Sequence, residues 1–216
     1  MIQRQRELIE NYAKEETDKL GLYAWPHVKR VARLCLKLAK ALGLVKVNTD
    51  VLEASALLHD IAKISEDKTS GKVDHGVIGA RMAEDFLMKS GFKKEFTDAV
   101  SHCILAHTHY VEPSSIEAKI LHDADYVDKV GAVGVASILI KACLSDTTIE
   151  GVLEAFESKT NDQSPVAKHI NQLRNPHLYT KPAKDLVEER NRMLLLYFGE
   201  LKNELELRDN EPNKKS

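Results

Sequence analysis

The segment from about Asp50 to Ala62 constrains the fold of this chain more than any other part. Its apolar residues cover nearly every face of the helix that they predict, and two candidate capping residues, Asn48 and Thr49, precede it. Such a helix is expected to lie at the centre of a core. It also carries His59 and Asp60, and a buried carboxylate has to be paired, protonated or bound to a metal.

Apolar residues recur at helical spacing along the rest of the chain, and no run of alternating β-branched residues indicates a sheet. We therefore predict an all-α fold. The other helices are expected at about 26–42, 74–90, 93–107, 115–143, 149–158 and 165–175, with a long last helix from about Thr180. The polar stretch from Ser65 to Lys72 interrupts this helical spacing, and we expect it to form a surface loop or a lid.

Charge and cysteine content narrow the class of protein. The 31 basic and 33 acidic residues give a net charge of -2, which indicates neither a polybasic membrane anchor nor a basic surface for nucleic acid. A nucleic-acid partner is not excluded by this charge, but gains no support from it. Cys35, Cys103 and Cys143 form no CxxC pair and fit a reducing compartment. With no apolar signal-like segment at the N-terminus, we expect a cytoplasmic protein that does not enter membranes.

The His59-Asp60 doublet is the first candidate for chemistry. Adjacent residues of a helix point about 100° apart, so both side chains reach one ion most easily near a helix end. The polar stretch from Ser65 indicates such an end close by. An imidazole and a carboxylate suit Mn, Fe, Co, Ni or Zn, and the carboxylate also suits Mg. For the doublet alone, a core histidine hydrogen-bonded to its neighbours is the competing interpretation.

Three further features favour a metal site. His27 begins a long helix beside its apolar stripe, so it can face the core. Three acids, Asp123, Asp125 and Asp128, directly precede an apolar run, so at least one of them should be drawn inward. Four histidines also cluster on the two helices between these regions: His75, His102, His107 and His109.

All of these residues except His102 and His109 occur in five strings whose order resembles one family: WPHVKRV, ALLHDIAK, DHGVIGA, ILAH and LHDADYVDKVGAVGVA. Together they resemble the HD superfamily of metal-dependent phosphohydrolases, and within it the YedJ-type branch of small stand-alone HD proteins. The resemblance runs from about residue 22 to 143 and continues weakly through the last helix.

The resemblance implies an HD-type helical bundle over residues 1–145, with C-terminal helices over 146–208 packed on the same core and a disordered tail over 209–216. It implies that His27, His59, Asp60 and Asp125 bind one divalent metal, which leaves Asp123 at most a supporting role. His75 and His107 match the extra ligands of two-metal branches. Asp60 and Lys63 are then the catalytic candidates, and the expected reaction is hydrolysis of a phosphoester or pyrophosphate bond by an activated water.

Two departures from the family pattern refine this expectation. Lys63 stands where nucleoside monophosphatases of the superfamily carry an acid, which argues against that activity. Tyr126 stands where many relatives carry Arg or Lys, which weakens a phosphate contact there. The expected substrate is a small phosphorylated molecule, with a nucleotide favoured, and a homodimer is compatible with the long last helix. The alternative function is a non-catalytic HD-fold sensor that binds nucleotide and metal without turnover.

Overall fold

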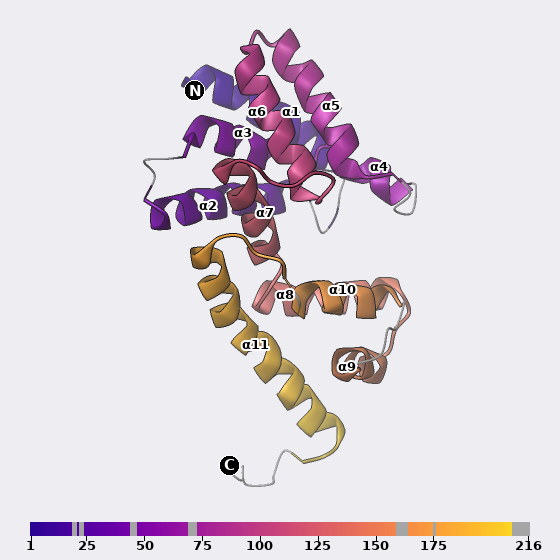
Figure 1. Ribbon diagram of the computed structural model, residues 1–216. Coiled ribbons are helices and arrows are strands. Elements are labelled where there is room, and N and C mark those ends of the chain that lie inside the picture. The colour runs from indigo at the N-terminus through magenta and orange to yellow at the C-terminus, as the bar shows by residue number, and fades with distance from the viewer. Residues whose placement is uncertain are drawn as a thin grey trace. The chain divides into compact units, whose positions relative to one another are not determined.

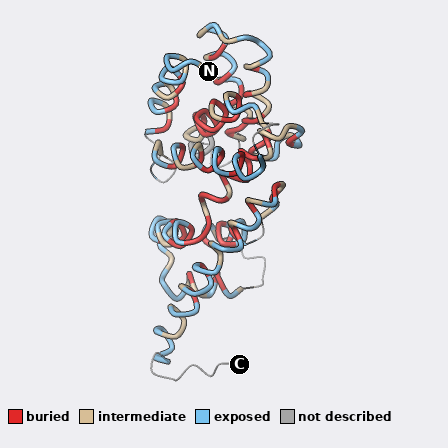
Figure 2. Tube along the Cα trace, turned by 90° about the vertical axis from the view of Figure 1, so that its left-hand side faces the viewer, coloured by how far each residue is buried: buried red, intermediate tan, exposed pale blue. Residues whose placement is uncertain are grey.

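The computed structural model describes residues 1–18, 21, 24–43, 47–68, 73–158, 164–174 and 176–208, and within these ranges it is helical with no strand. Two compact units divide the chain: Met1–Asp128 with Leu178–Lys184, and Lys129–His177 with Asp185–Ser216. The prediction of an all-α fold is confirmed (Figure 1). Along most helices buried and exposed positions alternate, as Figure 2 shows, which is the pattern of amphipathic helices packed on a core.

The first unit contains seven helices in its described residues. They are α1 (Gln3–Thr17), α2 (Trp25–Ala41), α3 (Thr49–Leu58), α4 (Lys63–Lys68), α5 (His75–Lys89), α6 (Lys94–His107) and α7 (Ile116–Asp128). The predicted central helix is α3, which packs against α1, α2, α6 and α7 and buries seven of its ten residues. In Figure 1, α5 and α6 lie side by side over the same core.

Capping residues begin two of these helices as the sequence indicates. The Asn48 side chain accepts a hydrogen bond from the Val51 amide at 3.2 Å, and Asp74 accepts one from the Val77 amide at 3.1 Å. Both bonds satisfy backbone donors that the first turn of a helix leaves without partners.

The central helix ends at Leu58, four residues before the predicted end at Ala62. The reason lies in the side chain of His59, whose Nδ1 donates to the Ala56 carbonyl at 2.8 Å. That carbonyl would accept the Asp60 amide if the helix continued. Residues 59–62 therefore form a tight turn, and both members of the doublet leave the helix at its end.

The single helix predicted over 115–143 is wrong, because the chain breaks between α7 and α8 (Ala132–Leu144). Gly131 adopts a left-handed φ of 74° at the break, and a Cβ there would lie 2.9 Å from Cβ of Arg190. A side chain at this position would be strained in its backbone and would collide with the later helix. Both effects explain why glycine occupies it.

The second unit contains α8, α9 (Ile149–Glu157), α10 (Pro165–Arg174) and most of α11 (Lys181–Leu205). Phe156 and Phe198 stack with ring centroids 4.0 Å apart at its core. Among the described helices, none combines the length and the apolar character that crossing a membrane requires. The packing of the C-terminal helices on the core of the first 145 residues stays a prediction, and the predicted tail over 209–216 lies outside the described residues.

Candidate metal centre

Six predicted site residues meet inside the first unit, and most of them stand at helix ends. His27 lies in the first turn of α2, His75 begins α5 and His107 ends α6. His59 and Asp60 follow α3, and Asp125 comes from α7. All six are buried, with exposed fractions from 0% for His59 to 9% for Asp125.

One face of the cluster consists of two histidines and two carboxylates. Nε2 of His27 lies 3.5 Å from Oδ2 of Asp60 and 3.3 Å from Oδ1 of Asp125. Nε2 of His59 lies 3.5 Å and 3.8 Å from the same two oxygens. Four side chains that are far apart in sequence thus direct their polar atoms at one point.

The other oxygen of Asp60 faces a second pair of histidines. Oδ1 lies 3.2 Å from Nε2 of His75 and 3.8 Å from Nε2 of His107, and these two nitrogens are 3.1 Å apart. The structure therefore offers two groups of possible ligands, His27 with His59 and Asp60, and Asp60 with His75 and His107. Asp60 belongs to both.

The hydrogen positions show why a cation fits. A carbonyl oxygen only accepts, so Nδ1 of His59 carries the proton that it donates to Ala56, and its Nε2 presents a lone pair. This nitrogen is buried, has no hydrogen-bond partner among the described residues, and faces carboxylate oxygens. His107 is held in the same way by the Ile104 carbonyl.

Lone pairs that converge without a proton between them repel, and a cation at the point of convergence removes that repulsion. Ligand bonds of about 2.1 Å at angles of 90–110° place two ligand atoms about 3.0–3.4 Å apart. The distances within the cluster, 3.1–3.8 Å, are close to this range. The residues present therefore fit a divalent metal.

His27 has a carboxylate behind it that fixes its orientation. Its Nδ1 donates to Oδ2 of Asp128 at 2.8 Å, and Arg30 donates to both oxygens of Asp128 at 2.8 Å and 2.9 Å. A carboxylate behind a ligating histidine selects the tautomer and strengthens the ligand. The sequence did not indicate this role for Asp128 or its ion pair with Arg30.

Charges around the cluster favour cation binding. Burial lowers the pKa of His27, but hydrogen bonds with Asp125, Asp128 and Asp60 outweigh it and raise that pKa to about 10. Burial lowers the pKa of His59 to about 4, so this ring is neutral. Burial alone would raise the pKa of Asp60, but the surrounding histidines hold it well below its usual range. The carboxylates around His27 therefore hold a proton on it, and the same negative charge would hold a metal ion in the place of that proton, beside the neutral imidazole of His59.

Asp123, the acid that the resemblance set aside, points away from this cluster. Its carboxylate accepts hydrogen bonds from the Tyr179 amide at 2.9 Å, the Thr180 amide at 2.7 Å and the Thr180 hydroxyl at 2.6 Å. It therefore fixes the segment Leu178–Lys184 to the first unit, just before α11 begins. Its partners lie more than 50 residues away, so local sequence could not indicate this contact.

Three further candidates from the sequence are not among these six residues. Lys63 begins α4 half-buried, and its amide donates to the Asp60 carbonyl at 3.0 Å. Nε2 of His102 accepts a hydrogen bond from the Ser114 amide at 3.2 Å. Tyr126 is half-buried on α7. The catalytic role of Lys63 and the assignment of individual ligands stay predictions.

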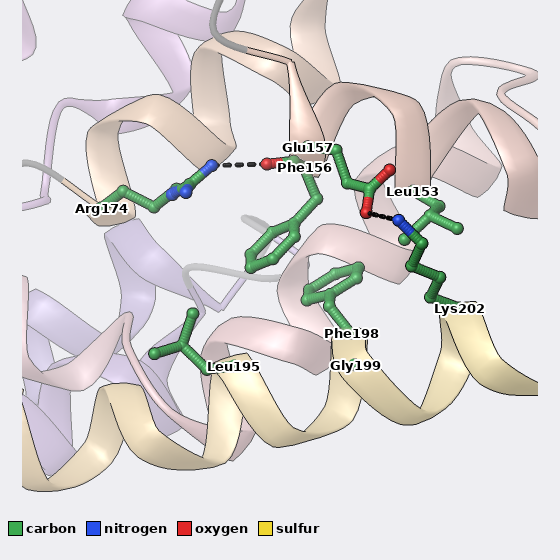
Figure 3. A pocket seen from close by; sticks show the side chains of 8 residues that line it. All are labelled: Leu153, Phe156, Glu157, Arg174, Leu195, Phe198, Gly199 and Lys202. Atoms are coloured by element: carbon green, nitrogen blue, oxygen red, sulfur yellow. Dashed lines mark hydrogen bonds and ion pairs between the residues drawn. The ribbon is translucent and has the colours of Figure 1, made fainter. Parts of the chain in front are cut away.

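A separate pocket of about 300 Å³ lies in the second unit (Figure 3). Two cations line it, but both have partners: Arg174 donates to the Phe156 carbonyl, and Lys202 pairs with Glu157 at 2.6 Å. The stacked rings of Phe156 and Phe198 form its apolar wall. With its charges already neutralised or hydrogen-bonded, this pocket offers less for an anionic ligand than the buried histidine cluster.

Known proteins resemble the chain in both sequence and fold. Residues 25–130 match the model of the HD domain family. The chain is 27% identical to YpgQ of Bacillus subtilis over 197 residues, which cover 88% of this chain and 87% of that protein. It is 34% identical to ribonuclease Y of Thermoanaerobacter pseudethanolicus over 101 residues, or 47% of this chain and 17% of that enzyme.

Two crystal structures show the same fold. YpgQ in complex with ADP has a TM-score of 0.66 at 24% identity, covering 93% of this chain and 97% of that chain. A predicted HD superfamily hydrolase from an uncultured Thermotogales bacterium has a TM-score of 0.64 at 24% identity, covering 94% and 92%.

Proposed function

Because residues 25–130 match the HD domain family, we propose that the chain is a metal-dependent phosphohydrolase that acts on a phosphoester or pyrophosphate bond of a nucleotide. The observation that carries the proposal is the convergence of buried ligand atoms from His27, His59, Asp60 and Asp125. The nucleotide is favoured because the related YpgQ has been crystallised with ADP.

Each residue of the cluster has a separate task in this proposal. His27, His59, Asp60 and Asp125 hold the first cation, and His75 and His107 complete a second position through the other oxygen of Asp60. Asp128 keeps His27 in the tautomer that presents Nε2. A divalent cation bound there polarises a phosphoryl oxygen and lowers the pKa of water.

Lys63 is proposed to contact the phosphate. It begins the short helix directly after the turn that carries Asp60, so its backbone is fixed next to the centre. Its ammonium group would balance negative charge on the substrate. Charge reversal in Lys63→Glu should therefore raise KM for a phosphate ester more than it changes metal content.

Metal content and turnover test the proposal together. Protein purified without added metal is measured by inductively coupled plasma mass spectrometry, and phosphate release is followed with Mn²⁺, Co²⁺, Ni²⁺ or Mg²⁺ on nucleoside mono-, di- and triphosphates. Wild type should bind metal and should hydrolyse at least one of these three classes of nucleotide. Asp60→Asn should lose at least about 100-fold in rate, since even losing a partner of a ligand costs 10- to 100-fold.

Asp98→Asn is the matched control, because Asp98 is an exposed carboxylate on α6 that pairs with Lys94 on the same helix. Circular dichroism must first show that both variants are folded, since a lost ligand can unfold a metal site. Metal-loaded wild type that binds nucleotides but hydrolyses none of them would refute the enzyme and establish the sensor instead. A metal-to-protein ratio near two would support the second position at His75 and His107.

A further inference from the structure

Three rings form a cluster beside the metal centre in the first unit. The ring centroids of His109 and His122 are 4.2 Å apart, and those of His122 and Tyr179 are 5.3 Å apart. His109 and Tyr179 are 6.4 Å apart. His122 is buried, Tyr179 is half-buried and His109 is exposed, so the cluster extends from the interior to the surface.

The cluster is connected to the candidate ligands at two points. His122 precedes Asp125 by three residues on α7, which places the two on one face of the helix and about 4.5 Å apart along its axis. Nδ1 of His122 also donates to the carbonyl of His107 at 3.1 Å. The cluster is therefore connected to the candidate ligands through His122.

The α7 side of the centre is one of two places where the candidate ligands keep some exposure. His59 and His27 are 0% and 2% exposed, whereas Asp125 keeps 9% and its neighbour His122 keeps 6%; His75, on α5, keeps 8%. A molecule whose phosphates reach the ligands along α7 meets the ring of His122, which contacts the rings of His109 and Tyr179.

His109 is held in a conformation that a ring-bearing residue rarely adopts. Its φ is 62°, and its amide donates to the Ala106 carbonyl just after α6 ends. Glycine is the usual residue at such a position, because a Cβ is strained there. Strained residues cluster at ligand sites, so the φ of His109 makes its ring a candidate for contact with a ligand.

We propose that His109, His122 and Tyr179 form the surface on which the base of a nucleotide stacks while its phosphates occupy the metal centre. The inference rests on the proposed function for the place of the phosphates. Every nucleobase has an aromatic face, and stacking on protein rings strengthens binding without strict sequence preference. His109 and Tyr179 supply the exposed rings, and His122 positions them through its contacts with both.

Equilibrium binding separates this inference from catalysis. We would measure the affinities of ADP and of inorganic pyrophosphate for Mn²⁺-loaded protein by isothermal titration calorimetry, because pyrophosphate has the phosphates without the base. His109→Gly and Tyr179→Ala should each weaken ADP binding by roughly 5- to 150-fold. Pyrophosphate affinity should stay within twofold of wild type.

Three further variants sharpen the test. Tyr179→Phe keeps the ring and should keep ADP affinity. Tyr110→Ala removes an exposed aromatic residue outside the cluster and should change neither affinity. His109→Gly should also raise the urea midpoint of unfolding, because it relieves the strained φ, so a weaker binder that is more stable cannot be explained by misfolding.

The outcomes distinguish the two proposals. ADP binding that depends on the rings in a protein without turnover would sustain this inference and refute the hydrolase. Wild type that does not bind ADP, or variants that bind ADP as wild type does, would overturn the stacking surface and leave hydrolysis of other phosphoesters standing. Equal losses for ADP and pyrophosphate would also overturn it.

Discussion

Replacing Asp123 by alanine should destabilise the first unit more than any single surface change. The carboxylate is fully buried and accepts three hydrogen bonds, two from Thr180 and one from the Tyr179 amide. Without it, the Thr180 amide and hydroxyl lose their acceptor in a buried position, at about 1–3 kcal/mol each. Tyr179 is half-buried, so water can reach its amide, and the loss of the hydrogen bond from this amide costs less.

Although Asp123 belongs to α7, its carboxylate lies next to the N-terminus of α11, and this position adds a further contribution to stability. A negative charge near a helix N-terminus stabilises it by about 0.3–1 kcal/mol, and by more where the site is partly buried. The sum is about 2–7 kcal/mol, a large part of the roughly 5–15 kcal/mol by which a domain is stable. Thr180→Val removes the hydroxyl alone and should cost about 1 kcal/mol.

Urea unfolding measures the effect through the fluorescence of Trp25, the one tryptophan of the chain, which lies on α2 of the first unit. Asp98→Ala is the matched control, because that carboxylate is exposed on α6 and should leave the midpoint unchanged. A loss below about 1 kcal/mol for Asp123→Ala would show that the three hydrogen bonds do not hold Leu178–Lys184 in place, and the reasoning above would fail.

Two further predictions concern one residue in each unit. Burial, together with the charges of Lys141 and Lys129, lowers the pKa of His169 to about 4 in the folded protein. In the unfolded chain the pKa is near 6.5, so the unfolded chain binds a proton that the folded protein does not bind between these values. The free energy of unfolding should therefore fall by about 2 kcal/mol from pH 7 to pH 5. His169→Gln should remove that dependence in urea titrations, and an unchanged slope would contradict it. Asp128→Asn should weaken metal affinity by about 10- to 100-fold in chelator competition, because His27 loses its orienting carboxylate.

The sequence was sufficient for the all-α class and for the position of the central helix. Apolar spacing predicts α3 as buried on all sides, and the structure confirms it because seven of its residues are buried. Spacing could not place the break at Gly131, since the apolar run continues through it. The break depends on the approach of Arg190, which follows 59 residues later in the sequence.

The candidate site could be predicted only in part from the spacing and the types of the residues. Asp123, Asp125 and Asp128 all precede an apolar run, and residue type alone could not separate them. Each faces a different partner: Thr180, the histidine cluster and Arg30. These partners come from distant parts of the chain, so only the resemblance selected Asp125 in advance. The stacking rings were equally hidden, because Tyr179 joins His109 and His122 only in the folded first unit.

The helix α7 carries four polar residues with separate tasks, His122, Asp123, Asp125 and Asp128, and nine of its thirteen residues are buried. One inserted residue turns the rest of a helix by about 100° and advances it by about 1.5 Å. An insertion ahead of His122 would therefore misdirect all four side chains at once, whereas a substitution removes one contact. We expect descendants of this chain to vary α7 residue by residue but to keep its length, while insertions accumulate in the surface loops.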